Sequence, residues 1–185
     1  KRGNNMIHIF LANGFEDIEA LTPLDVLRRA GLDVQLVSIS SGFEVKSSHG
    51  VRVVADATLD SIDLSDSEAM IIPGGMPGAS NLRDNLALRK ALQTQNAAER
   101  LVCAICAGPI VLSAAGILKE RKATCYPGFE GQLPGAIHST ALVEEDGNII
   151  TGRGPGAAMD FAFAILKRFI SRDVVKKMRQ GMILE

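Results

Sequence analysis

Two cysteines stand three residues apart in the segment LVCAICAGPIVLSAAGIL, which covers residues 101–118. The apolar run over residues 101–105 predicts a buried strand, and Gly108-Pro109 predicts the start of a helix. Cys106 is then expected on the turn between them, where a nucleophile can be presented next to a backbone N–H that stabilises an oxyanion. A helix start also favours a thiolate, so we predict a lowered pKa for Cys106. A buried structural cysteine is the alternative.

Cys103 is expected inside the strand, with its side chain in the packing layer of the sheet. Cys103 and Cys106 match the C-x-x-C spacing of redox dithiols, but in such dithiols both sulfurs lie at a helix start. Cys125 and three scattered histidines are the remaining soft ligands. Without a second closely spaced pair they do not predict a zinc site. The sequence therefore predicts free thiols, with no metal and no other cofactor.

The sequence PGG at residues 73–75 follows a second predicted buried strand. Gly74 and Gly75 can adopt the dihedral angles that turn successive N–H groups inward as an anion-binding nest. A plain turn is the alternative for these residues. If the nest forms, it supplies a second set of oxyanion donors for the cysteine.

Glu19 lies one turn into a helix that is expected to begin near Glu16, on the side that can face the strand ends. Glu16 and Asp17 fit the ordinary role of acidic residues in a first helical turn. A carboxyl group beside a thiolate should hold a proton, because two adjacent negative charges are disfavoured. We therefore predict a raised pKa for Glu19.

The elements that must position these residues alternate between strands and helices. The sequence predicts strands over residues 6–12, 33–40, 69–75, 101–105 and 122–125, and hairpins over 43–56 and around Asp146-Gly147. It predicts helices over 16–31, 85–100, 108–116 and from GRGPG to about 170, followed by an amphipathic segment over 173–184. This alternation predicts a doubly wound, flavodoxin-like α/β fold, with a mostly parallel sheet and helices on both faces. Ligands of such folds bind at the carboxyl ends of the strands, where these candidate residues would meet.

The composition narrows the classes of partner. The chain has 185 residues, which fits a single domain over residues 6–185, with residues 1–5 set apart as a trimmed or added end. Its formal net charge of -1 argues against nucleic acid binding. No apolar run approaches the roughly 20 residues that cross a bilayer, so no membrane association is expected. Three cysteines, an odd number, favour a reducing, cytoplasmic location.

Four segments in this order, NGFEDIEA, IIPGGMPGASNL, AICAGP and TGRGPGAAMDFA, resemble the ThiJ/PfpI family. The likeness is to the branch that contains the Parkinson's-disease-linked protein deglycase and its bacterial relatives, and it runs from residue 6 to residue 178. It implies a flavodoxin-like sandwich of the class I glutamine amidotransferase-like type, usually a homodimer. It also implies that Cys106 is a reactive, easily oxidised nucleophile and that Glu19 is its carboxyl partner.

The resemblance further implies an oxyanion site at the amides of Gly75 and Ala107, with Arg153 holding the packing beside the cysteine loop. The chain departs from the family pattern at two places. Tyr126 stands where many relatives carry a histidine, and a tyrosine is a poor general base at neutral pH. Ala107 stands where the protease-like branch has a histidine, so proteolysis is not expected. His49 corresponds to a basic position near the pocket in relatives, although an ordinary exposed loop residue fits equally well.

These expectations leave three functions open. The first is an enzyme whose Cys106 thiolate attacks a small α-oxoaldehyde, or a glycated adduct of one, while Glu19 moves a proton. The second is a non-enzymatic sensor of oxidative stress, in which Cys106 is oxidised to a sulfenate and then to a sulfinate. The third is a small-molecule hydrolase with an unknown substrate.

Overall fold

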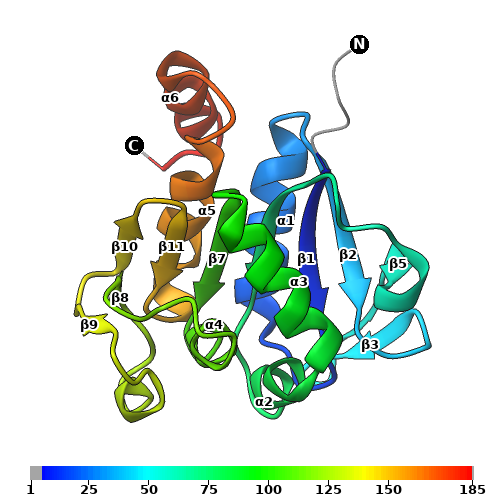
Figure 1. The fold of residues 1–185 in the computed structure, drawn as a ribbon. Coiled ribbons are helices and arrows are strands. Elements are labelled where there is room, and N and C mark those ends of the chain that lie inside the picture. The colour runs from blue at the N-terminus through cyan, green and yellow to red at the C-terminus, as the bar shows by residue number, and fades with distance from the viewer. Residues whose placement is uncertain (1–5, 185) are drawn as a thin grey trace.

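The computed structural model describes residues 6–184, and the end segment 1–5 that the sequence analysis sets apart lies outside the described residues. Its centre is a sheet in the strand order β10-β11-β7-β6-β1-β2-β5 (Figure 1). Every neighbouring pair in this sheet is parallel except β10 and β11, which are antiparallel. The strands are β1 (Met6–Leu11), β2 (Asp33–Ser38), β5 (Ala57–Thr58), β6 (Ser67–Ile72), β7 (Leu101–Ile105), β10 (Val143–Asp146) and β11 (Ile149–Gly152). The predicted flavodoxin-like, mostly parallel sheet is confirmed.

Helices cover both faces of the sheet (Figure 1). One face packs against α1 (Asp17–Arg29) and α5 (Ala158–Leu166), and the other against α2 (Gly78–Asp84), α3 (Leu86–Ala97) and α4 (Pro109–Ala114). The chain ends in α6 (Arg172–Gly181), and three 3-10 turns lie at Leu59–Ser61, Glu130–Gln132 and Pro155–Ala157. The central strands are buried on both sides, which explains why most of their residues are apolar.

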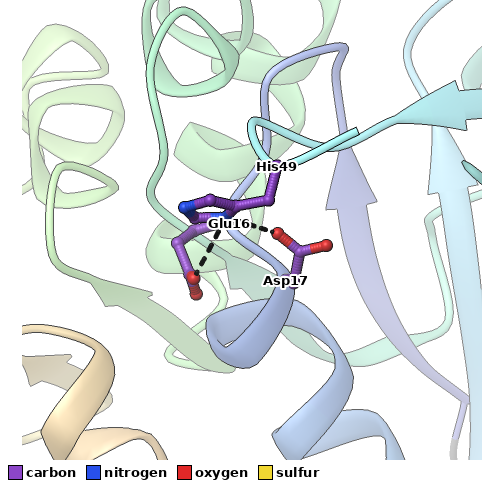
Figure 2. A group of neighbouring side chains, drawn as sticks. All are labelled: Glu16, Asp17 and His49. Atoms are coloured by element: carbon purple, nitrogen blue, oxygen red, sulfur yellow. Dashed lines mark hydrogen bonds and ion pairs between the residues drawn. The ribbon is translucent and has the colours of Figure 1, made fainter. Parts of the chain in front are cut away.

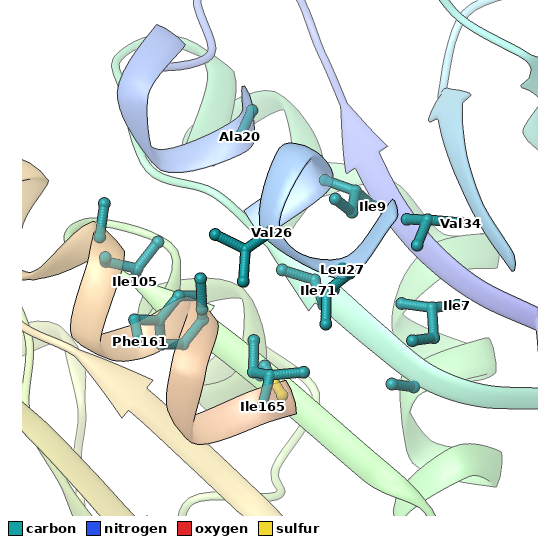
Figure 3. Packing of buried hydrophobic residues seen from close by; sticks show 14 of the residues in the cluster. Ile7, Ile9, Ala20, Val26, Leu27, Val34, Ile71, Ile105, Phe161 and Ile165 are labelled. Atoms are coloured by element: carbon teal, nitrogen blue, oxygen red, sulfur yellow. The ribbon is translucent and has the colours of Figure 1, made fainter. Parts of the chain in front are cut away.

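Alternate residues of the central strands form two separate hydrophobic clusters. Ile7 and Ile9 of β1 pack in the cluster under α1 and α5, where Figure 3 shows them near Leu27 and Val34. Phe10 of the same strand belongs to the cluster on the opposite face. The two-residue period of the strand therefore divides one apolar run between two cores.

Two short sheets lie outside the central one. The predicted hairpin around His49 is confirmed as β3 (Glu44–Lys46) and β4 (Arg52–Val54). The strand predicted over 122–125 is shorter: β8 (Lys122–Ala123) pairs with β9 (Ile137–His138) and does not join the central sheet. The chain leaves the β8 ladder at Thr124, because the Thr124 N–H donates to the Thr151 hydroxyl at 3.0 Å.

The helix predicted over 85–100 corresponds to α3, and a second helix, α2, lies directly before it. Asn85 ends α2 and caps α3, since its side chain accepts the Leu88 N–H at 2.9 Å. The sequence pattern does not predict α2. None of the helices within residues 6–184 is both long enough and apolar enough to span a bilayer.

Strands β7, β6 and β1 are direct neighbours, and all three run in the same direction. Their carboxyl ends are therefore adjacent along one edge of the sheet. Cys106, the segment 73–75 and the start of α1 follow these three ends. This arrangement brings together the segments that carry the candidate residues.

Candidate active site

Cys106 is the first residue after β7 and has a positive φ of 64°. This backbone conformation is uncommon for residues other than glycine and marks a tight elbow. The elbow is held on both sides, because the Cys106 N–H donates to the Gly152 carbonyl at 2.9 Å and its own carbonyl accepts the Tyr126 N–H at 2.9 Å. The side chain is almost buried, since the residue is 9% exposed. The backbone thus fixes the position of the thiol.

Glu19 is fully buried and faces this elbow from the first turns of α1. Its Oε2 accepts the Gly74 N–H at 2.8 Å, and its Oε1 is buried with no hydrogen-bond partner. The Cys106 thiol lies beside this carboxyl group, close enough that each group shifts the pKa of the other. The structure thus brings together the two residues that the sequence analysis treats as partners.

Gly75 and Ala107 direct their backbone N–H groups at the sulfur of Cys106. Gly75 has a φ of 87°, and a Cβ at this position would lie 2.4 Å from the Glu16 nitrogen and 2.5 Å from the Gly14 carbonyl oxygen. Glycine is therefore required both by the dihedral angle and by the close backbone approach. Two amides from different loops converge on the thiol, as an oxyanion site needs.

The pKa of Glu19 is raised, as predicted, but the pKa of Cys106 is not lowered. Burial raises the pKa of Glu19 to about 7, and the charge of Glu16 contributes in the same direction. The prediction of a lowered pKa for Cys106 is wrong. Burial raises the pKa of this thiol, and the negative charge of Glu19 raises it further, while the amides of Ala107 and Gly75 offset only part of this. The helix start that suggested a lowered pKa is outweighed by desolvation.

His49 does not contact Cys106. It lies at the tip of the β3–β4 hairpin and points at the start of α1, where its Nδ1 is 2.8 Å from Asp17 Oδ2 and 3.9 Å from Glu16 Oε1 (Figure 2). The hydrogen bond to Asp17 raises the pKa of His49. The sequence analysis assigned ordinary first-turn roles to both acids. Glu16 is instead the buried N-cap of α1 and accepts the Glu19 N–H at 2.8 Å.

Tyr126 and Arg153 flank the elbow without reaching the thiol pair. The Tyr126 ring is exposed and packs edge-on against Phe129, so only its backbone supports Cys106. Arg153 donates from Nη1 to the Thr140 carbonyl at 2.8 Å. These contacts fit a packing role for Arg153.

The three cysteines are free thiols. Cys103 is fully buried in the core under α1 and α5, as expected, and burial raises its pKa. Burial also raises the pKa of Cys125, to about 11. Of the three, only Cys106 has both a carboxyl group and two backbone amides directed at its sulfur.

The sequence matches known proteins over nearly its whole length. The model of the DJ-1/PfpI family matches residues 5–168. The Parkinson disease protein 7 homolog of Danio rerio is 34% identical over 181 residues, which is 96% of each chain. Protein dj-1beta of Drosophila melanogaster is 32% identical over 181 residues, or 95% of each chain.

Solved structures agree with these matches. A mutant of a DJ-1 superfamily protein from Salmonella typhimurium has a TM-score of 0.93 at 33% identity, covering 97% of this chain and 98% of that one. The oxidized DJ-1 of Toxoplasma gondii has a TM-score of 0.91 at 35% identity, covering 96% of this chain and 97% of that one. Sequence and fold agree with the resemblance found in the four motifs, and the chain therefore belongs to the DJ-1/PfpI family.

Proposed function

We propose that the protein is a cysteine-dependent enzyme of the glyoxalase or deglycase type. Its substrates would be small α-oxoaldehydes such as methylglyoxal, or their adducts on proteins or nucleotides. The observation that carries this proposal is the contact between Cys106 and Glu19 beside the amides of Gly75 and Ala107. A nucleophile, a proton carrier and two oxyanion donors are the groups that addition to a carbonyl requires.

The reaction begins with the proton that Cys106 and Glu19 share once the pair has lost its first proton near pH 7. In the reactive form Glu19 holds this proton and Cys106 is a thiolate. The sulfur adds to the aldehyde carbon, so a C–S bond forms and the carbonyl electron pair moves to oxygen. The two amides stabilise the oxyanion, and Glu19 then protonates it to give a neutral hemithioacetal.

In the next step the Glu19 carboxylate removes the hydrogen of the former aldehyde carbon as a proton and returns a proton to the neighbouring ketone carbon. The hydroxyl proton moves to the ketone oxygen, so the aldehyde carbon is oxidised to a thioester and the ketone carbon is reduced to an alcohol. Water then adds to the thioester and gives a proton to Glu19. The C–S bond breaks, lactic acid leaves and loses its acid proton to water as lactate, and the thiolate is restored. Water is the only co-reactant.

The test is lactate formation from methylglyoxal by purified protein. We expect Cys106→Ala to lower the rate at least about 100-fold, because the nucleophile is lost. Cys125→Ala is the matched control, since it removes another buried thiol that lacks the carboxyl partner, and its rate should stay near that of the unchanged protein. Lactate formation no faster than with Cys106→Ala would refute the proposal.

A second function is favoured by one further observation. With a pKa of about 7, Glu19 holds a proton near neutral pH that it can donate to an oxidised sulfur. A relative with a similar fold, the DJ-1 of Toxoplasma gondii, has been solved in an oxidized form. A peroxide sensor would therefore use the same pair. Intact mass and peptide mapping after mild peroxide should then place added oxygen on Cys106, with Cys103 unchanged.

The family resemblance implies a homodimer, and the odd number of cysteines favours a cytoplasmic location. We propose that the protein is a homodimer and that it acts in the cytoplasm. Sedimentation of the purified protein tests the first, and fractionation of the source cells tests the second. A monomer at micromolar concentration would contradict the homodimer.

A further inference from the structure

Three metal-ligating side chains meet at the first turn of α1, next to the backbone of Gly75. Glu16 and Asp17 come from the start of the helix, and His49 reaches them from the β3–β4 hairpin, as Figure 2 shows. One ligand atom from each residue lies within 4.8 Å of the other two. Ligand atoms bound to one ion at about 2 Å are themselves about 3 to 4 Å apart. The observed spacing therefore needs only small side-chain movements to enclose an ion.

One carboxylate oxygen of this group is buried without a hydrogen bond. Glu16 is only 8% exposed, and its Oε1 lies 3.9 Å from His49 Nδ1. Asp17 Oδ1 is buried with no hydrogen-bond partner. Buried oxygens of this kind are normally paired, so Asp17 Oδ1 calls for an explanation. A bound cation would supply the missing partner.

The charges at this turn are also unbalanced. Among the residues that the structure describes, no lysine or arginine forms an ion pair with Glu16 or Asp17, and His49 is the only basic side chain next to them. Two carboxylates side by side repel each other, and their partial burial weakens screening by solvent. A divalent ion would neutralise both charges while leaving the imidazole uncharged as its third ligand.

The ligands are held in place before any ion binds. Glu16 Oε2 accepts the Glu19 N–H at 2.8 Å, which fixes the carboxylate as a helix cap. The hairpin tip is fixed by Ser47, whose hydroxyl accepts the His49 N–H at 3.2 Å and the Val51 N–H at 3.0 Å. The His49 ring itself is exposed, so water or a small ligand can fill the remaining coordination positions.

We propose that Glu16, Asp17 and His49 bind one divalent transition-metal ion such as Zn²⁺. Carboxylate oxygens alone would suit Mg²⁺ or Ca²⁺ equally well, but an imidazole nitrogen shifts the preference toward zinc and its neighbours. The site is separate from the cysteine, and the proposal does not depend on the proposed enzyme activity. The simpler alternative is an ion pair between His49 and Asp17 with no metal.

The test is titration of chelator-treated protein with Zn²⁺ by calorimetry, in a Cys106→Ser background so that the thiol takes no metal. We expect one ion per chain, and Mg²⁺ should bind more weakly. His49→Ala should weaken zinc binding by about tenfold or more, because a direct ligand is lost. His138→Ala is the matched control, since His138 faces only one carboxylate, that of Glu130, at 3.9 Å.

A second measurement identifies the ligand atom. Zinc bound at His49 Nδ1 should shift the ¹⁵N resonance of that nitrogen, whereas a simple ion pair leaves it unchanged on adding metal. Zinc binding that survives in His49→Ala would overturn the proposal. So would no binding at about 0.1 mM zinc, or equal affinity for Mg²⁺. Because His49 is exposed, its variant should fold, and a thermal unfolding curve checks this.

Discussion

Glu19 and Cys106 face each other across Gly74, whose lack of a side chain leaves the space in which the carboxyl group and the thiol meet. A Cβ at Gly74 would lie 2.5 Å from Glu19 Oε2 and 2.7 Å from the Cβ of Cys106. Because each group shifts the pKa of the other, the two titrate as a pair, and the first proton lost near pH 7 belongs to both. The position of the remaining proton decides whether Cys106 is reactive.

The first prediction concerns the pH at which Cys106 alkylates. If Glu19 keeps the shared proton, as the proposed mechanism requires, alkylation of the unchanged protein should rise near pH 7, where the pair loses its first proton. Glu19→Gln leaves the buried thiol to ionise without a proton-sharing partner, so the midpoint should move to higher pH. Peptide-resolved alkylation rates against pH measure this, and Cys103, which is fully buried, serves as the inert reference.

The opposite result has a distinct signature. If the sulfur keeps the proton, Cys106 should resist alkylation until strongly alkaline pH, because burial and the Glu19 charge both raise the pKa of the thiol. Glu19→Gln would then lower the midpoint, since the charge is removed. That outcome would rule out thiolate attack near neutral pH.

The second prediction concerns stability against pH. The pKa of Glu19 is raised from 4.5 to about 7, so the folded protein holds this proton more tightly than the unfolded chain does. The stabilisation is complete below pH 4.5 and is lost as the pH rises through 7, which amounts to about 3 kcal/mol. Urea unfolding with EDTA at pH 5 and pH 8 should show this loss relative to Glu19→Gln. A difference between the two proteins that stays constant with pH would contradict it.

The third prediction concerns His8, which should make the protein less stable as the pH falls, whereas Glu19 makes it less stable as the pH rises. Burial lowers the pKa of His8 from 6.5 to about 4, and the Nδ1 of its ring shares a hydrogen bond with the Ser67 hydroxyl at 2.9 Å. Between pH 6.5 and about pH 4, His8 is therefore protonated in the unfolded chain but neutral in the folded protein. The stabilisation is complete above pH 6.5 and falls by about 3 kcal/mol as the pH drops to about 4. The unfolding free energy of His8→Gln should lack this part of the acid sensitivity.

The fold could be predicted from the sequence where one local residue pattern is enough to determine a strand or a helix. The buried strands β1, β6 and β7 consist mostly of apolar residues, and their parallel order follows from the helices between them. The helix α2 was missed because PGASNLRD contains turn formers and has no apolar periodicity. The pairing of β8 could not be predicted, since the Thr124 contact with Thr151 joins residues far apart in sequence.

The candidate site was likewise predictable from the sequence only where local motifs determine it. Cys106 and Glu19 could be located from local motifs, because strand ends and helix starts determine where they lie. The direction of the Cys106 pKa could not be predicted, since it depends on burial by residues from several elements. The partners of His49 were missed because a hairpin tip carries no local signal of which helix it contacts. An exposed histidine next to two acids becomes visible only in three dimensions.

The last prediction tests the space at Gly74. In Gly74→Ala the added methyl group must displace the Glu19 carboxyl or the Cys106 side chain, and overpacking of this kind costs about 1 to 3 kcal/mol. We expect lower unfolding stability together with a change in the alkylation midpoint of Cys106, because the pair is pushed apart. Gly156→Ala is the matched control, since a Cβ there meets nothing within 4 Å, and it should alter neither quantity by much. If Gly74→Ala lost stability but kept the Cys106 titration of the unchanged protein, the carboxyl group would not control the thiol, and the contact between Glu19 and Cys106 would be packing alone.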